Sequence, residues 1–181
     1  MRLLQILPTF FLTITISATF PTAVSFAQPA GNFTASNKPI TQNGIEVQIV
    51  SVLVENVRLE RFGGYFSQSP DQQLVIKVQI INQTGRQLSY QTWRGDITGL
   101  TGATVQDDQG AQYPQTPPPE GFTVFGAAAD TANINAGQAL SDILTFQKPN
   151  PGARNLYITL PGSNVGAPQD FDFVAPAPAA K

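Results

Sequence analysis

Apolar side chains recur at every second position along the stretch QLVIKVQII, residues 73–81. The residues of this alternating set, expected to point inward, are Leu74, Ile76, Val78 and Ile80. Lys77 and Gln79 lie between them, so an extended chain has one apolar and one polar face here. This two-residue period is typical of a β-strand buried on one side, and no window in the rest of the domain shows a helical stripe. The stretch therefore predicts a sheet that buries one of its faces.

Shorter segments of similar character follow one another, with turn-forming Gly, Asn, Asp and Pro between them. They are 45–54, 87–93, 103–106, 111–114, 139–146, 155–160 and 170–174. In the first of these the alternation slips by one residue near Val50 and Ser51, which predicts a β-bulge. About seven to nine short strands at this spacing indicate an all-β chain, folded as an antiparallel β-sandwich with little or no helix.

The chain divides into four predicted parts. Residues 1–27 resemble a secretory signal peptide, with Arg2 before an apolar stretch and small residues ending at Ala27. Residues 28–43 are expected to form a flexible leader, 44–174 the sandwich domain, and 175–181 a disordered Ala/Pro tail. This predicts a periplasmic or secreted protein without membrane insertion after cleavage, and the alternative is that the segment stays as an uncleaved anchor.

The amino-acid composition limits the classes of function that the chain can have. The chain has neither cysteine nor histidine, so it lacks a thiol nucleophile, the commonest general base and the commonest transition-metal ligand. Its 10 basic and 12 acidic residues argue against a nucleic-acid partner, because phosphate binding requires a dense basic patch. We therefore expect a non-enzymatic protein without a cofactor. A hydrolase based on two carboxylates is the weakest hypothesis, because no pair of acids stands out.

Asp107 and Asp108 in QDDQGAQ form the one acidic pair with a possible metal role. Calcium takes about six to eight oxygen ligands from flexible loops, so the pair is a candidate calcium site if another acid folds nearby. The simpler interpretation is a β-hairpin turn, in which Asp accepts backbone N–H groups and Gly110 adopts a positive φ.

Candidate interaction residues come from two segments. Arg94 and Asp96 are the ends of an Arg-Gly-Asp tripeptide, a sequence that adhesion receptors recognise but that also arises by chance. Phe122 and Phe125 lie in the long segment 114–133, for which we favour a short edge strand that folds back onto the sandwich. The alternative is a functional or mobile loop.

The single tryptophan, Trp93, is expected in the core. Trp93 directly precedes the tripeptide, and sandwich domains commonly bury a tryptophan between their sheets. Tyr90 is three residues before it, so on a regular strand it points to the opposite face and is expected to be the more exposed of the two.

The order of these motifs over residues 73–161 resembles a class of secreted bacterial immunoglobulin-like domains of unknown function, related in fold to a secreted immunoprotective antigen. The matching positions are Asn82, Tyr90, Asp107, Gly110, Tyr113, Gly137 and Phe146. The resemblance implies an immunoglobulin-like sandwich and transfers no catalytic residue.

Together these features predict an exported interaction or structural module of the cell envelope, with an unidentified envelope or extracellular protein as its partner. The alternative is a calcium-dependent adhesive domain that uses Asp107 and Asp108.

Overall fold

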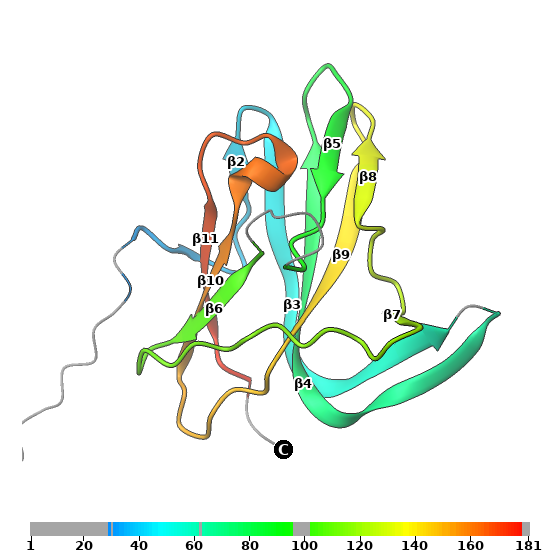
Figure 1. Cartoon of the computed structure of the whole chain (residues 1–181). Coiled ribbons are helices and arrows are strands. Elements are labelled where there is room, and N and C mark those ends of the chain that lie inside the picture. The colour runs from blue at the N-terminus through cyan, green and yellow to red at the C-terminus, as the bar shows by residue number, and fades with distance from the viewer. Residues whose placement is uncertain (1–28, 30, 62, 96–101, 179–181) are drawn as a thin grey trace, which may run out of the picture.

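The computed structural model describes residues 29, 31–61, 63–95 and 102–178, and it confirms the predicted fold class. Nearly all regular structure is β, and most strand pairs are antiparallel (Figure 1). One short 3-10 helix, η1 (Gly162–Val165), lies between β10 and β11. Among the described residues, no helix has the length and apolar character needed to cross a membrane.

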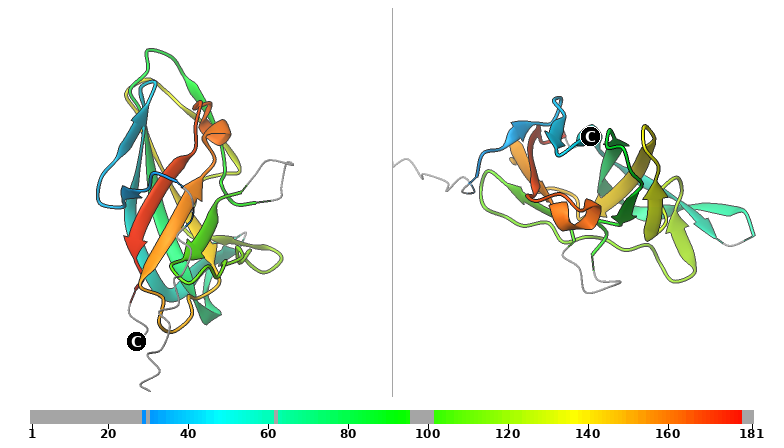
Figure 2. Two further views of the ribbon diagram at one scale, coloured as in Figure 1. Left: turned by 90° about the vertical axis from the view of Figure 1, so that its left-hand side faces the viewer. Right: turned by 90° about the horizontal axis from the view of Figure 1, so that it is seen from above.

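Two sheets face each other, as the views in Figure 2 show. The first has the order β1-β11-β10-β6, with β1 (Thr34–Ala35), β11 (Phe171–Pro176), β10 (Asn155–Leu160) and β6 (Thr104–Asp107). The second has the order β2-β3-β4-β9, with β2 (Ile40–Gln42), β3 (Ile45–Arg61), β4 (Tyr65–Asn82) and β9 (Ala139–Phe146), and β7 (Phe122–Val124) also pairs with β3. A separate pair joins β5 (Leu88–Gln91) to β8 (Thr131–Ile134).

The main core lies between the two sheets and contains the residues that the alternation selects. In QLVIKVQII, the side chains of Leu74, Ile76, Val78 and Ile80 have no exposed surface. They pack with side chains of the opposite sheet, which include Leu156, Ile158, Phe171 and Phe173. The predicted slip in register is also confirmed, because β3 and β4 lose their regular pairing between Ile49 and Ser51.

The β3–β4 hairpin extends far beyond the sandwich. Its strands have 17 and 18 residues, and their outer ends project to the lower right in Figure 1. We call this outer part the arm, defined as residues 57–61 and 65–69 together with β7. The sequence predicts strands only to residue 54 and from residue 73, so the arm is an addition to the expected fold.

Two further segments differ from their predicted structure. The segment expected to be a flexible leader contains β1, which pairs with β11, and β2, which pairs with β3. Residues 111–114, expected to be a strand, contribute only a bridge between Gln106 and Gln112. The edge strand expected near Phe122 does form, and it pairs with the end of β3 in the arm.

Candidate functional site

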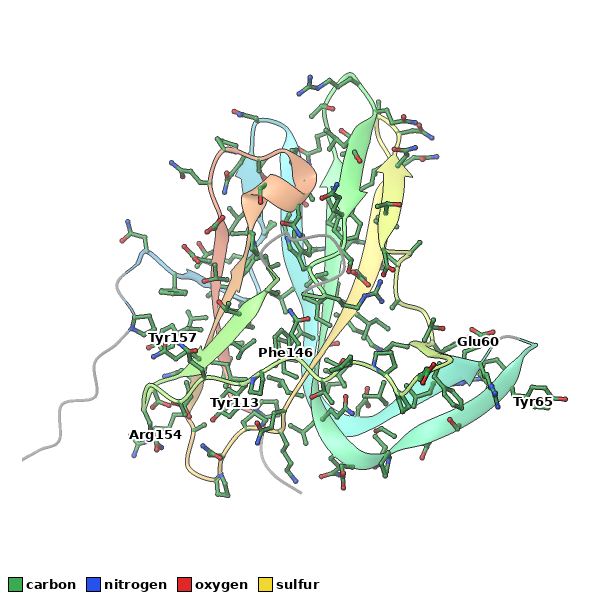
Figure 3. The ribbon with its side chains drawn as sticks, in the orientation of Figure 1. Glu60, Tyr65, Tyr113, Phe146, Arg154 and Tyr157 are labelled. Atoms are coloured by element: carbon green, nitrogen blue, oxygen red, sulfur yellow. The ribbon has the colours of Figure 1, made fainter. Side chains whose placement is uncertain are left out.

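The arm carries a group of aromatic side chains around one arginine. The Arg58 guanidinium carbon lies 4.2 Å from the ring centres of both Phe66 and Phe125. The two rings meet edge to face, with their centres 5.3 Å apart. Phe66 and Phe125 expose 50% and 41% of their surface, and Tyr65 exposes 74%. Figure 3 shows Tyr65 pointing outward at the far end of the arm.

The opposite face of the arm is held by a small core of its own. Val57, Leu59, Val75 and Val124 are buried together, and Phe122 packs against them. Residues directly opposite each other in a β-ladder point to the same side, so the pairing of Leu59 with Val124 places β7 over this cluster. The N–H of Phe125 donates to the carbonyl of Arg58 at 2.9 Å, which fixes the ring beside the guanidinium.

A cleft of about 820 Å³ opens where the arm meets the sandwich. Its apolar lining comes from β7, from the prolines that precede it and from the alanines that follow it. Phe122, Val124, Pro117, Pro118, Ala127 and Ala128 are the apolar residues among these. Arg94, Glu60 and Asp130 are the charged residues of the lining. This volume lies in the range of small-molecule and peptide sites.

A buried carboxylate, Asp142, contacts two of the residues that line the cleft, Ala128 and Arg94. Asp142 has no exposed surface, and its Oδ2 accepts the O–H of Tyr90 at 2.5 Å and that of Thr92 at 3.1 Å. Its Oδ1 accepts the backbone N–H of Ala128 at 2.9 Å. The nearest basic atom is Nη1 of Arg94, at 3.8 Å. Burial is the main cause that raises the pKa of Tyr90 above its ordinary value, and the adjacent Asp142 adds to it, so the phenol stays protonated and donates.

Arg94 is directed into the molecule. Only 18% of its side chain is exposed, and its Nη2 donates to the carbonyl of Ala128 and to Asp130 at 3.3 Å. The guanidinium of the Arg-Gly-Asp tripeptide therefore has internal partners. Asp96, the other predicted interaction residue in this segment, lies outside the described residues.

Trp93 fills the core as predicted, whereas the prediction for Tyr90 is wrong. Both side chains have no exposed surface, and their ring centres are 5.3 Å apart. The reason is that β5 ends at Gln91, so the chain leaves the extended conformation between the two residues and the alternation no longer applies. The indole N–H of Trp93 donates to the carbonyl of Pro161 at 2.9 Å, which ties this segment to the other sheet.

The acidic pair lies at the end of β6, where Asp107 is the last residue of the strand. Asp107 is fully buried, and its Oδ1 accepts the N–H groups of Gln109 and Ala111 at 2.9 Å each. Its Oδ2 accepts the phenol O–H of Tyr113 at 2.6 Å. These contacts build the Asp-x-x-Gly-x-x-Tyr hairpin, in which Gly110 has a φ of 84°.

Asp108 points elsewhere, because its Oδ1 accepts the N–H of Arg154 at 2.9 Å. That hydrogen bond is the main cause that lowers the pKa of Asp108. Within the described part of the chain, no group of three or more metal-ligating side chains gathers. The calcium site remains a prediction without a third acid beside it.

The predicted interaction residues are thus brought together only in part. Phe122 and Arg94 line the same cleft, while Phe125 lies on the outer face of the arm. Sequence reasoning missed Arg58, Phe66 and Asp142. The signal for the first two was the Val57–Leu59 alternation, which continues the strand past residue 54 and carries Arg58 on its other face.

Comparisons with known proteins define the class of fold. No family model matches the chain, and no curated protein matches it either. The yjhA protein from Bacillus subtilis aligns with 78% of this chain and 97% of its own, with a TM-score of 0.51 and 11% identity. An uncharacterized β-sandwich protein from Clostridium difficile covers 83% of this chain and 99% of its own, with a TM-score of 0.44 and 11% identity. At 11% identity the likeness to the yjhA protein shows a similarity of fold alone.

Proposed function

We propose that this chain is a non-enzymatic protein-interaction module that acts outside the cytoplasm, with the outer face of the arm as its contact surface. The observation that carries the proposal is the exposed cluster of Arg58, Phe66 and Phe125 on a ribbon that projects from the sandwich. Tyrosine and arginine dominate binding energy in protein interfaces, and aromatic residues as a group are enriched there. Exposure of such an apolar surface to water is unfavourable, so burial of the cluster against a partner would be favourable.

The cluster is already ordered before any partner binds. Arg58 contacts the faces of both rings, and the N–H of Phe125 is hydrogen-bonded to the carbonyl of Arg58. Side chains that are immobilised in the free protein cost less conformational entropy on binding, which favours affinity. The cleft on the other side of β7 extends the surface, because Phe122 lines the cleft and Phe125 lies in the cluster.

Export is the second part of the proposal. It rests on the signal-like pattern of residues 1–27 and on the resemblance to secreted immunoglobulin-like domains. Mass spectrometry of the protein from the producing cell is the test. A mature chain that begins at Gln28 in an extracytoplasmic fraction is the expected result, and an intact Met1 in the cytoplasm would overturn this part.

The arm is tested by site-specific photocrosslinking in the producing cell. A photoreactive phenylalanine analogue at Tyr65 is expected to give a discrete adduct with a second protein, and the same analogue at exposed Gln87 is expected to give none. The adduct should disappear when Phe125→Ala is added. Equal adducts from both positions, or an adduct indifferent to Phe125→Ala, would contradict the assignment of the contact surface to the arm.

A further inference from the structure

Of the described strands, two pair with the outer edge of β3, one at each end, and none pairs with its middle. Along its other edge β3 pairs with β4 for nearly its whole length. On the outer edge, β2 pairs with residues 45–47 and β7 with residues 59–61, and Figure 1 shows these two strands at opposite ends of β3. Among the described residues, β4 is the only strand that pairs with residues 48–57. We call residues 48–57 the β3 gap.

The backbone of the β3 gap is available for pairing. A strand bonded on one side directs alternate N–H and C=O groups toward its other side. No backbone hydrogen bond joins the gap to any described segment other than β4. Val50 and Leu53 are 57% and 43% exposed, and Glu55 is the only charged residue in the gap. The pairing of β3 with β4 is irregular near both ends of the gap and regular over residues 51–56. This regular stretch, with β-branched residues and one charge, is a template for an added strand.

The two flanking strands, β2 and β7, limit which segments can pair with the β3 gap. A second copy would have to bring its own 17-residue β3 into the gap, and that strand would collide with β2 and β7 at either end. The copy's own β2 and β7 would obstruct the approach in the same way. A short extended segment meets neither obstacle. At ~3.3 Å per residue, a segment of about six to eight residues fits between the flanking strands.

We propose that the β3 gap binds an extended segment of a partner protein by β-strand addition. The segment runs between β2 and β7 and completes the outer edge of β3. It lacks proline at the positions that donate to β3, because proline has no N–H. It carries β-branched or aromatic residues opposite Val50 and Leu53 and a Lys or Arg near Glu55, because such cross-strand pairs are favourable. This surface is separate from the aromatic cluster, so either proposal can fail without the other.

The test begins with selection of binders from a displayed library of random peptides of about eight residues, using the whole protein as bait. The best peptide is synthesised with a fluorophore, and its affinity is measured by anisotropy. We expect the selected peptides to share an alternating apolar pattern. N-methylation of the backbone amides that donate to β3 should lower the affinity about tenfold or more. Bound peptide should also slow amide hydrogen exchange within residues 48–57. N-methylation removes the donors that β-addition uses and leaves the side chains unchanged.

Two exposed substitutions provide the matched control. Leu53→Lys places a charge within the gap and should weaken peptide binding about tenfold, whereas Tyr65→Lys at the tip of the arm should leave it unchanged. Selection that yields no binder, binding that survives N-methylation, or amide protection outside the gap would each overturn the proposal. A dimer that Leu53→Lys dissociates, detected by sedimentation, would assign the gap to a second copy and would also overturn it.

Discussion

In the inner part of the β3–β4 hairpin, Leu74 and Ile76 are fully buried beneath the facing sheet, whereas in the outer part Phe66 is half exposed on the same strand. The difference does not lie in the local conformation, because both parts are antiparallel β-ladder. It lies in what covers each face. The inner part has a second sheet above it, and the outer part has only β7 and a small cluster on one side. One hairpin therefore supplies core at one end and an open surface at the other.

The largest expected effect belongs to the inner region. Asp142→Ala removes the acceptor of Tyr90, Thr92 and Ala128 and leaves Arg94 without its buried counter-charge. We expect the free energy of unfolding to fall by about 3–5 kcal/mol, because a buried pair is broken by removal of one partner. Denaturant unfolding measures it. The matched control is Asp130→Ala, whose exposed pair with Arg94 should contribute about 0–1 kcal/mol. Equal costs would contradict the role of Asp142.

Two truncations on β4 test the contrast between the buried inner part and the exposed outer part of the hairpin. Ile76→Ala should cost about 2–5 kcal/mol, because it leaves a cavity in the core. Phe66→Ala should cost below about 1 kcal/mol, because half of that ring is exposed and its contact with Arg58 is a surface cation–π pair. The same denaturation experiment compares them. A cost for Phe66→Ala as large as that for Ile76→Ala would mean that the arm is part of the core and would remove the argument for a contact surface.

The hairpin of Asp107 should show a smaller effect with a distinct pH dependence. Tyr113→Phe removes the O–H donated to Asp107 and should cost about 1–3 kcal/mol near neutral pH. Burial, with the hydrogen bond to Asp107, raises the pKa of Tyr113 to about 12, above an unfolded value near 10.0. This contribution is complete below pH 10 and is lost as the pH rises toward 12.

The measurement is the melting temperature of both proteins across that range. The wild type should lose stability more steeply than Tyr113→Phe, and the two curves should converge. Parallel curves would show that Tyr113 is not responsible. Tyr90, whose pKa is also raised, is present in both proteins and cancels in the comparison.

Calcium should have the smallest effect. Both carboxylate oxygens of Asp107 already accept hydrogen bonds from within the chain. We therefore expect the same melting temperature in millimolar calcium and in chelator, because only a ligand that binds the native state raises it. A rise that Asp108→Asn abolishes would instead favour the calcium-dependent adhesive alternative.

The strands that form the main core could be predicted because each carries its own signal. Alternation along QLVIKVQII and DFDFV places the buried residues without knowledge of their partners. The Asp-x-x-Gly-x-x-Tyr hairpin is also local, since Asp107 bonds to residues within six positions of itself. The arm is different, because β7 pairs with a part of β3 that lies some 60 residues earlier in the chain.

Asp142 shows the same limit at a single residue. In ALSDILTF the alternation places Asp142 on the same face as Leu144 and Phe146, where an apolar side chain is expected, and it is fully buried there. Its burial depends on Tyr90 and Thr92, about 50 residues away, whose hydroxyl groups compensate the desolvated charge. No spacing within β9 encodes those partners.

The sequence by itself determined that this protein is built from one-sided strands joined by tight turns, because side-chain alternation and turn chemistry act over a few residues. The tertiary structure alone decided which surfaces stay open. The aromatic cluster of the arm and the β3 gap exist because strands distant in the chain cover some edges and faces of one hairpin and leave others uncovered. Whether a strand edge or sheet face is covered depends on residues distant in the chain, so it follows from tertiary packing and not from the local sequence pattern.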